Sequence, residues 1–391
     1  MKSCFQRLSL VFLVIFVFAS FSLAQKRPVK PVKKVPQEQT EAKPAADNRA
    51  ALEMVFVLDT TGSMGGLIEG AKQKIWGIVN EVMQKESRPR VRVGLVAYRD
   101  IGDEYVTKIL PITEDLDKVY TTLMGYKADG GGDEPENVRR ALAEGVKQAG
   151  WSQPKTGLAQ ILFLVGDAPP QNYKQEPDVL ITTAEAVRKN MIVNTIQCGG
   201  INGTREIWQQ IARRGEGKYF AIAQDGGVLA VSTPYDKKLA ELAEKIGKTY
   251  ITYGNAAAQR VNAARQVSNE VTITSGATVS AQAERAVNKA VNSFQYEGDL
   301  LQDIENDAVK LKDVKKEDLP EELKNLSPED RKKEVEKRLA ERAEIRKEIM
   351  ELSRQRDAFV AAERKKLGEQ SGFDAAVTQA LSEQLLKKGI K

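Results

Sequence analysis

Oxygen-bearing side chains stand at the ends of two apolar segments of this sequence. Asp59 is the last residue of the run 54–59, and Thr61 and Ser63 follow in the next turn. Asp167 directly follows the run 161–166. If both runs are parallel strands, their carboxyl ends meet at the same edge of a sheet. Oxygen ligands without nitrogen or sulfur suit a small divalent cation such as Mg²⁺. The spacing therefore predicts a metal site, although a helix expected from about residue 65 would also turn its positive end towards an anion there.

The composition excludes most familiar catalytic chemistry. The 391 residues include no histidine and two cysteines, Cys4 and Cys198. Without histidine there is no Ser-His-Asp or Cys-His pair and no histidine-ligated zinc or iron. Two cysteines supply neither a thiolate zinc site nor an iron–sulfur cluster. The net charge of +5, from 59 basic and 54 acidic residues, predicts no concentrated basic face, so we expect no nucleic-acid partner.

The N-terminal residues are typical of a secretory signal peptide. Residues 1–24 combine a short basic start, an apolar run and small residues before Ala24, after which we expect cleavage. An uncleaved anchor is the alternative; after cleavage no transmembrane segment is expected. The mature protein would be secreted or periplasmic and would keep Cys198 alone, without an internal disulfide. Residues 25–47 form a Pro/Lys-rich linker, either a plain spacer or a basic tether to an anionic surface.

Strand-like and helix-like segments alternate from residue 48 to residue 254. Continuous apolar runs predict strands at 54–59, 91–98, 105–110, 161–166, 191–198 and 218–223. Helical spacing predicts helices at 67–83, 138–146, 178–189, 205–212 and 233–246. Apolar strands separated by amphipathic helices are typical of an α/β fold with a mostly parallel, doubly wound sheet. The sequence therefore predicts one such domain at 48–254.

The rest of the chain is expected to be largely helical. Residues 255–300 are poorly patterned and are interpreted as a connector, and residues 301–391 contain 21 acidic and 21 basic residues. A long helix is predicted from Ser327 to about Lys366, with an apolar stripe that Arg342 and Arg356 interrupt. It is either a coiled-coil or partner-binding helix or a solvated helix laid on the main domain. We expect the Lys and Arg side chains of this tail to face solvent.

The segment Asp59-x-Thr61-x-Ser63 after a hydrophobic strand resembles the metal-ion-dependent adhesion site of von Willebrand factor type A domains. Asp167 matches the acid of that family's third loop. The second loop, residues 130–136, lacks the common Gly-Gly-Thr form and resembles the Asp-x-Pro-Glu loop of the integrin β-subunit I-like domain. The resemblance implies that Glu136 replaces the usual Thr as a metal ligand. The implied metal set is Asp59, Thr61, Ser63, Glu136 and Asp167.

A second cation is also implied by this resemblance. In the integrin relatives it is shared by residues that match Asp100, Asp133 and Glu136, but Gly131 stands where they have an Asn. Their third site needs paired acids where this chain has Gly65, Gly66 and Leu67, so that site is not expected. The alternative for Asp59 is a helix cap without a metal. For Asp100 and Asp133 the alternative is a turn acid or an ion pair with Arg99.

The resemblance implies a binding module rather than an enzyme. Its metal keeps one coordination position open, which an Asp or Glu carboxylate of a partner protein fills. Under this reading Thr61, Ser63 and Glu136 touch Mg²⁺ directly, while Asp59 and Asp167 act partly through water. Glu136 lowers the net charge of the site, so Ca²⁺ or Mn²⁺ is an alternative ion. Two other functions remain: a metal-dependent hydrolase with an Asp or Lys base, and a scaffold that acts through the charged C-terminal helices.

Overall fold

The computed structural model describes residues 49–132, 136–228, 231–367 and 372–391. The segment from Ala45 to Lys391 forms one compact unit. The predicted signal peptide and linker, and Asp133 of the predicted second metal site, lie outside the described residues. Within the described ranges, no helix is both long enough and apolar enough to cross a membrane.

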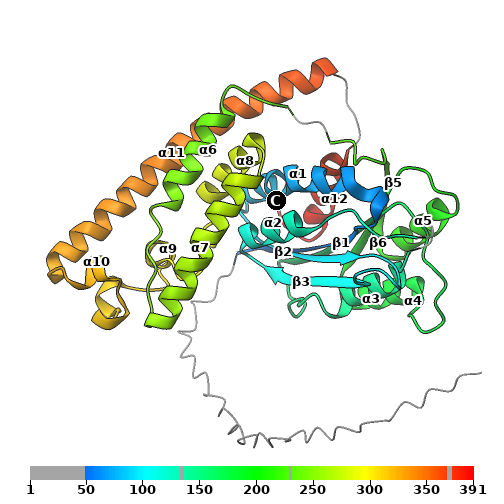
Figure 1. Cartoon of the computed structure of the whole chain (residues 1–391), viewed down its shortest axis with the longest axis horizontal. Coiled ribbons are helices and arrows are strands. Elements are labelled where there is room, and N and C mark those ends of the chain that lie inside the picture. Colours follow the sequence, from blue (N-terminus) through cyan, green and yellow to red (C-terminus); the bar gives the residue numbers. More distant parts are fainter. Residues whose placement is uncertain (1–48, 133–135, 229–230, 368–371) are drawn as a thin grey trace, which may run out of the picture. The chain divides into compact units, whose positions relative to one another are not determined.

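A six-stranded sheet forms the centre of the first half of the chain (Figure 1). Its strands are β1 (Ala51–Asp59), β2 (Arg90–Tyr98), β3 (Thr107–Thr113), β4 (Leu158–Gly166), β5 (Ile192–Cys198) and β6 (Glu216–Ile222). They lie in the order β3-β2-β1-β4-β5-β6, and only the β2–β3 pair is antiparallel. The predicted α/β class with a mostly parallel sheet is confirmed. Since β1 pairs with both β2 and β4, the strand order reverses beside β1, where such sheets bind ligands.

Helices cover both faces of this sheet. One apolar core includes residues of α1 (Gly65–Met83) and α2 (Leu116–Gly125), and the other includes residues of α3 (Val138–Lys147), α4 (Val179–Arg188) and α5 (Thr204–Arg214). Figure 1 shows α1 and α3 on opposite sides of the strands. The helix α2 was not predicted from the sequence, although Leu116, Tyr120 and Leu123 are buried on one of its faces. Tyr120 stacks on Trp76 of α1 with ring centroids 4.0 Å apart.

The C-terminal helix α12 (Phe373–Lys387) belongs to the core of the sheet and not to a separate tail. It packs against α1, β5 and β6. Phe373 lies 5.8 Å from Phe56 of β1, measured between ring centroids, and its backbone N–H donates to the carbonyl of Gly226, at 2.8 Å. Residues about 150 positions beyond the last strand therefore complete one face of the sheet.

Residues 255–300, interpreted from the sequence as a poorly patterned connector, are helical, in agreement with the largely helical character expected for the rest of the chain. They contain α7 (Ala256–Gly276), α8 (Val279–Val291) and the start of α9 (Leu300–Glu305). The helix α8 packs against α1 and against α6 (Asp236–Gly247). Its buried face combines the alanines Ala281, Ala283 and Ala286 with the charged residues Arg285 and Lys289. Alanines allow close helix packing but give a weak hydrophobic pattern in the sequence, which explains why these helices were missed.

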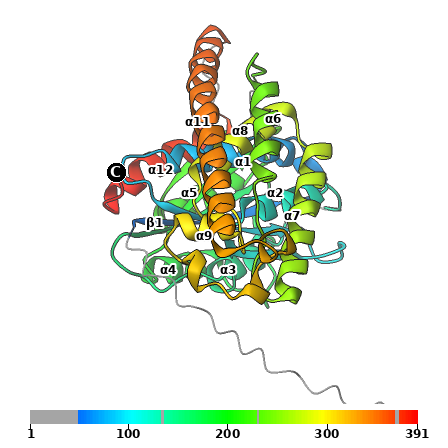
Figure 2. The same ribbon diagram turned by 90° about the vertical axis from the view of Figure 1, so that its left-hand side faces the viewer.

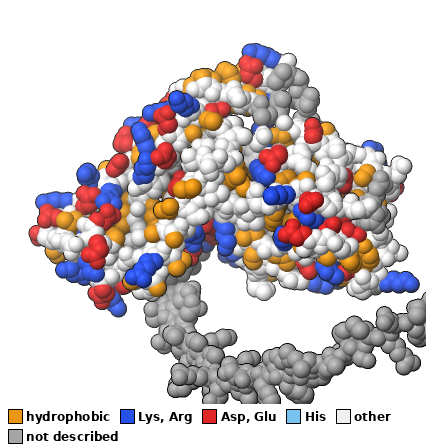
Figure 3. Space-filling model, in the orientation of Figure 1, with side chains coloured by type: hydrophobic (Ala, Val, Ile, Leu, Met, Phe, Trp, Pro, Cys, Tyr) orange, Lys and Arg blue, Asp and Glu red, His pale blue; other side chains and the backbone are white. Residues whose placement is uncertain are grey.

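The predicted long helix is present as α11 (Pro328–Leu367), preceded by the short α10 (Glu321–Lys324). Short 3₁₀ turns occur at Gly62–Met64, Leu311–Asp313 and Lys316–Asp318. Figure 2 shows α11 beside α6 and α8, against which it packs. Figure 3 shows acidic and basic side chains interspersed along the exposed face of the helical region. The helix thus lies on other helices of the same chain.

Two arginines of α11 contradict the expectation that the basic side chains of the tail face solvent. Arg342 is fully buried and donates to Asp299 at 2.6 Å and to Thr249 at 2.8 Å. Arg356, also buried, donates to Asp236 at 2.7 Å and to Glu284 at 2.6 Å. The two arginines that interrupt the apolar stripe are therefore buried on the same face of α11, where each forms ion pairs. A hydrophobic pattern cannot reveal such pairs.

A buried charge cluster connects α2 with α7 and α8. Arg285 donates to Asp117, with one contact at 2.8 Å, and to Glu270 at 2.8 and 2.9 Å. Lys289 donates to Glu270 at 2.7 Å and to the carbonyl of Ala243 at 2.8 Å. Burial lowers the pKa of Lys289 to about 8, because the charged form loses more solvation than its partners restore. These pairs fix the helical region on the sheet domain.

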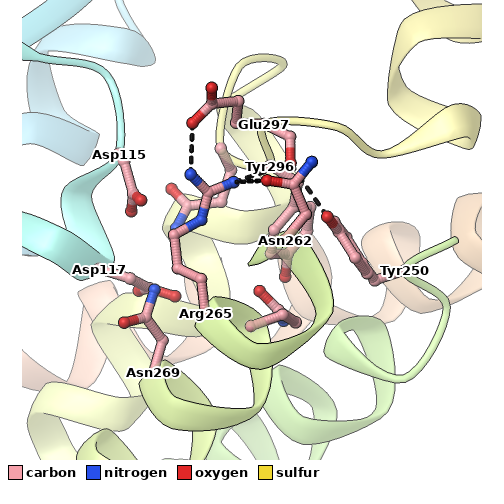
Figure 4. A pocket seen from close by; sticks show the side chains of 10 residues that line it. Asp115, Asp117, Tyr250, Asn262, Arg265, Asn269, Tyr296 and Glu297 are labelled. Carbon is pink, nitrogen blue, oxygen red and sulfur yellow. Dashed lines mark hydrogen bonds and ion pairs between the residues drawn. The ribbon is translucent and has the colours of Figure 1, made fainter. Parts of the chain in front are cut away.

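A small polar pocket adjoins this cluster (Figure 4). Arg265 of α7 pairs with Glu297 and donates to Asn262 at 3.2 Å, while the Tyr250 hydroxyl donates to the carbonyl of Glu297 at 3.0 Å. The space among these side chains is about 10 Å³, which is room for about one water molecule. The pocket is therefore part of the packing between helices.

Candidate metal centre

The first loop of the candidate site is a tight turn at the carboxyl end of β1. Asp59 Oδ1 accepts hydrogen bonds from the Thr61 N–H at 2.9 Å and from the Thr61 hydroxyl at 2.6 Å. The Thr61 and Ser63 hydroxyl oxygens are 3.4 Å apart. The carboxylate of Asp59 is fully buried, and its Oδ2 atom accepts no hydrogen bond. The turn thus gathers two hydroxyl oxygens beside an unpaired carboxylate oxygen.

Glu136 is brought to the same edge by backbone hydrogen bonds to the loop after β4. Its N–H donates to the Pro169 carbonyl at 3.2 Å, and its carbonyl accepts from Gln171 at 2.8 Å. The side chain is 4% exposed, and Oε2 is buried without a hydrogen-bond partner. A Cβ on Gly131, where φ is +77°, would lie 3.0 Å from both Glu136 Oε1 and Thr61 Cβ. Gly131 therefore allows the first and second loops to approach each other.

Asp167 completes the third loop. The β1–β4 register pairs Leu58 with Val165, so Asp59 and Asp167 leave the sheet beside each other. Asp167 Oδ2 accepts a hydrogen bond from Gln224 Nε2 at 2.7 Å, and the same nitrogen donates to the Ser63 carbonyl at 3.3 Å. Gln224 therefore connects the first and third loops.

Gathering these carboxylates has an electrostatic cost. Burial, together with the negative charge of nearby Asp167, raises the pKa of Asp59 to about 7, although the hydrogen bonds from Thr61 oppose this rise. Burial and the negative charges of Asp59 and Asp100 together raise the pKa of Glu136 to about 9. A divalent cation would offset the repulsion and satisfy the unpaired oxygens, since such ions prefer oxygen ligands. The donor set of Asp59, Thr61, Ser63, Glu136 and Asp167 therefore fits a hard divalent cation.

The hydroxyl groups are essential to this fit. Over the described ranges, no group of three or more Asp, Glu or Cys side chains is drawn together closely enough to hold a metal ion. A centre at this edge would therefore use the hydroxyl oxygens of Thr61 and Ser63 together with the carboxylates. Mg²⁺ commonly keeps several waters and takes few carboxylates, which suits such a set.

The structure brings Asp100, from the predicted second site, close to Glu136, whose pKa it raises. Asp100 is 4% exposed; its Oδ2 accepts from the Tyr173 hydroxyl at 2.6 Å, and its Oδ1 is buried without a hydrogen bond. Arg99, considered as an alternative partner, instead lies 3.8 Å from Glu104. The third site of the integrin relatives is not expected in this chain. At its position, a Cβ on Gly66 would lie 2.7 Å from the Asp225 Cα, so backbone occupies that space.

Three residues near the site were missed in the sequence: Asp103, Tyr173 and Gln224. Asp103 Oδ2 accepts from the Asp100 N–H at 3.0 Å, and both oxygens of its carboxylate accept from the Gly131 N–H at 3.2 Å. Gln224 follows β6, so the rule that strand ends share an edge could have found it. Tyr173 carries no such signal, because its position depends on the path of the loop after β4.

The fold agrees with the comparison with known families. Residues 53–234 match the family model described as the von Willebrand factor A domain, so the chain contains a domain of this family. Domains of this family are generally protein-interaction modules. The resemblance stated from Asp59, Thr61 and Ser63 is thereby confirmed for the domain.

Individual relatives share limited parts of the chain. The von Willebrand factor A domain-containing protein 7 of Rattus norvegicus is 40% identical over 96 residues, which are 25% of this chain and 10% of that protein. The chain spans only about a tenth of the length of the curated relatives it matches. Among solved structures, BatB from Bacteroides thetaiotaomicron is 18% identical with a TM-score of 0.32, covering 44% of this chain and 90% of that one. An aerotolerance-related membrane protein from Bacteroides fragilis is 17% identical with a TM-score of 0.32, at 45% and 92% coverage.

Proposed function

We propose that the von Willebrand factor A domain binds a divalent cation, Mg²⁺ in the first place, and through it an acidic side chain of a partner protein. The observation that carries this proposal is the pair of unpaired, buried oxygens, Asp59 Oδ2 and Glu136 Oε2, on separate loops at one sheet edge. A buried polar atom without a partner needs a physical explanation, and two such carboxylate oxygens at one sheet edge are explained by a bound cation. The charged form of both carboxylates would be stabilised by a cation.

Each residue of the site would have a defined role. Thr61, Ser63 and Glu136 would hold the ion directly, and Asp59 and Asp167 would act partly through water. Asp59 also fixes the turn, since its Oδ1 already accepts two hydrogen bonds from Thr61. The ion would supply a positive charge that attracts a carboxylate, so the role is binding and not bond cleavage. Because Glu136 reduces the net charge of the site, Ca²⁺ or Mn²⁺ could replace Mg²⁺ and carboxylate capture would be weaker.

We further propose that the protein acts in the periplasm or outside the cell. The support comes from the sequence of residues 1–24, which has the basic start, apolar run and small residues of a signal peptide. A site built from oxygen ligands needs no reduced thiol, and Cys198 is buried in β5. Such a site is compatible with an oxidising compartment.

Calorimetric titration of Mg²⁺, Ca²⁺ and Mn²⁺ into the full chain tests the metal step. We expect Ser63→Ala to weaken binding at least tenfold, because it removes a ligand oxygen. Ser268→Ala, on the exposed face of α7, is the matched control and should bind as the wild type does. Equal heats from the wild type, Ser63→Ala and Asp59→Ala would overturn the proposal.

A pull-down from the native envelope tests the partner step. The full chain is required, because α12 completes the core of the sheet domain. We expect a partner that is recovered with Mg²⁺ and lost with EDTA or with Ser63→Ala. If the partner is recovered equally well with EDTA and with Ser63→Ala, the interaction lies elsewhere, on the helical region. That result would contradict capture at the metal.

A further inference from the structure

A second pocket, of about 500 Å³, lies where the end of α1, the start of β2, the end of α8 and the middle of α11 meet. Four of its lining residues are arginines: Arg49, Arg88, Arg90 and Arg354. None of the lining residues is Asp or Glu. We call this the arginine pocket. Because guanidinium groups stay charged at any physiological pH, the pocket concentrates positive charge whatever the conditions.

Nearby acids neutralise only part of this charge. Arg90 pairs with Glu114 through one guanidinium nitrogen, but its Nε is buried without a hydrogen-bond acceptor. Arg354 lies 3.3 Å from Glu351 on the exposed surface of α11, where ion pairs contribute little. In the described part of the chain, no ion pair involves Arg88. The pocket therefore keeps unsatisfied cationic groups.

Two of the arginines are held on one aromatic ring. The guanidinium carbons of Arg49 and Arg90 lie 4.8 and 4.5 Å from the centroid of the Phe294 ring. Arg49 also donates to the Ser293 hydroxyl at 3.3 Å. Each cation gains from the ring, but placing two of them on it brings like charges together. The ring therefore holds two guanidinium groups at the pocket.

The backbone of Arg88 is also held in an unusual conformation. Its φ is +42°, in the left-handed region that non-glycine residues rarely adopt, and Pro89 follows it directly. The turn is closed by a hydrogen bond from the Arg88 N–H to the Lys85 carbonyl at 2.9 Å. Backbone strain of this kind persists where the surrounding structure over-determines it, commonly at ligand sites. Here it places an arginine at the pocket.

We propose that the arginine pocket binds a phosphate-class anion, either a free phosphate compound or a phospholipid headgroup. The four arginines come from three separate segments of the chain, and all of them line the pocket. A tetrahedral phosphate presents oxygens in several directions and accepts paired N–H donors, whereas a carboxylate offers two oxygens in one plane. The volume falls within the range of small-molecule sites. This inference does not depend on the metal centre.

Titration of inorganic pyrophosphate into the full chain tests the pocket. The titration is done at constant ionic strength with EDTA, so that the metal centre cannot contribute. We expect saturable binding that falls at least tenfold in the double variant Arg88→Gln/Arg354→Gln. The matched control is Arg213→Gln/Arg214→Gln, which removes the same charge from the exposed end of α5 and should bind as the wild type does.

A vesicle-binding experiment distinguishes the two sources of phosphate. Co-sedimentation with phosphatidylglycerol vesicles, compared with phosphatidylcholine vesicles, should depend on Arg88 and Arg354 if the ligand is a headgroup. Pocket-dependent binding of pyrophosphate alone would instead assign a soluble phosphate compound. The proposal is overturned if neither probe binds saturably, or if the control variant loses as much binding as the pocket variant does.

Discussion

Asn194 of β5 and Gln384 of α12 are 190 positions apart in the sequence and exchange two hydrogen bonds in the core. The Asn194 Nδ2 donates to Gln384 Oε1 at 3.0 Å, and the Gln384 Nε2 donates to Asn194 Oδ1 at 2.7 Å. Both side chains are buried, so each amide satisfies the other where water cannot reach. This pair fixes the position of the C-terminal helix on the sheet.

The first prediction concerns the contribution of α12 to stability. Leu381 is 2% exposed and lies in the same apolar core as β1 and β4. Leu381→Ala should lower the free energy of unfolding by about 3 kcal/mol, because it removes buried surface and leaves a cavity. Urea denaturation followed by tryptophan fluorescence measures this, since Trp76 and Trp208 are fully buried. Leu386→Ala, on the same helix but 62% exposed, should change stability by less than about 0.5 kcal/mol. Equal losses in both variants would contradict the packing of α12.

The second prediction concerns Gln224 and rests on the proposed metal binding. Its amide nitrogen donates to Asp167 at 2.7 Å and to the Ser63 carbonyl at 3.3 Å. Gln224→Ala should weaken Mg²⁺ binding by about tenfold, because Asp167 would lose the hydrogen bond that orients it. The midpoint of urea unfolding without metal should stay the same, which separates positioning from folding. Gln210→Ala, on the exposed surface of α5, is the control; a similar loss of affinity there would refute the role of Gln224.

The third prediction is a pH dependence caused by Lys289. Its pKa is about 8 in the folded protein and 10.5 when unperturbed. Between these values the unfolded state binds more protons than the native state, so stability should rise as the pH rises from 8 towards 10.5. The groups that face Lys289 are Glu270, Arg285, Asp117 and the Ala243 carbonyl. The rise attributable to Lys289 is at most about 3 kcal/mol.

Comparison with Lys289→Met checks this third prediction. The free energy of unfolding is measured by urea denaturation between pH 8 and pH 10 for both proteins. The variant should lack the part of the rise that belongs to Lys289, so the difference between the two curves changes with pH. Lys248→Met, which removes a lysine that is 71% exposed, should follow the wild-type profile. Parallel curves for the wild type and Lys289→Met would show that this lysine does not titrate in the window.

The sequence by itself determined the sheet and the side chains that stand at one edge of it, which are the candidate metal ligands. Continuous apolar runs predicted the six strands, because a parallel sheet covered on both faces needs apolar residues on both sides of each strand. Asp59 and Asp167 follow two such runs, and strand ends in a parallel sheet share an edge, so their convergence followed from local pattern. The divalent metal and its acidic partner remain predictions that the site supports.

Only the tertiary structure decided how distant segments complete this domain. The buried face of α8 mixes alanines with charged residues, so its hydrophobic pattern did not reveal it. The buried roles of Arg342 and Arg356 were likewise not visible, because ion pairing depends on partners far away in the sequence. The path of the chain in space also decides three other features. These are the position of α12 on β5 and β6, the hydrogen bonds of Gln224, and the presence of four arginines at one pocket. Periodicity reports which residues share a face of one element, whereas contacts between elements are set by packing and charge pairing across the whole fold.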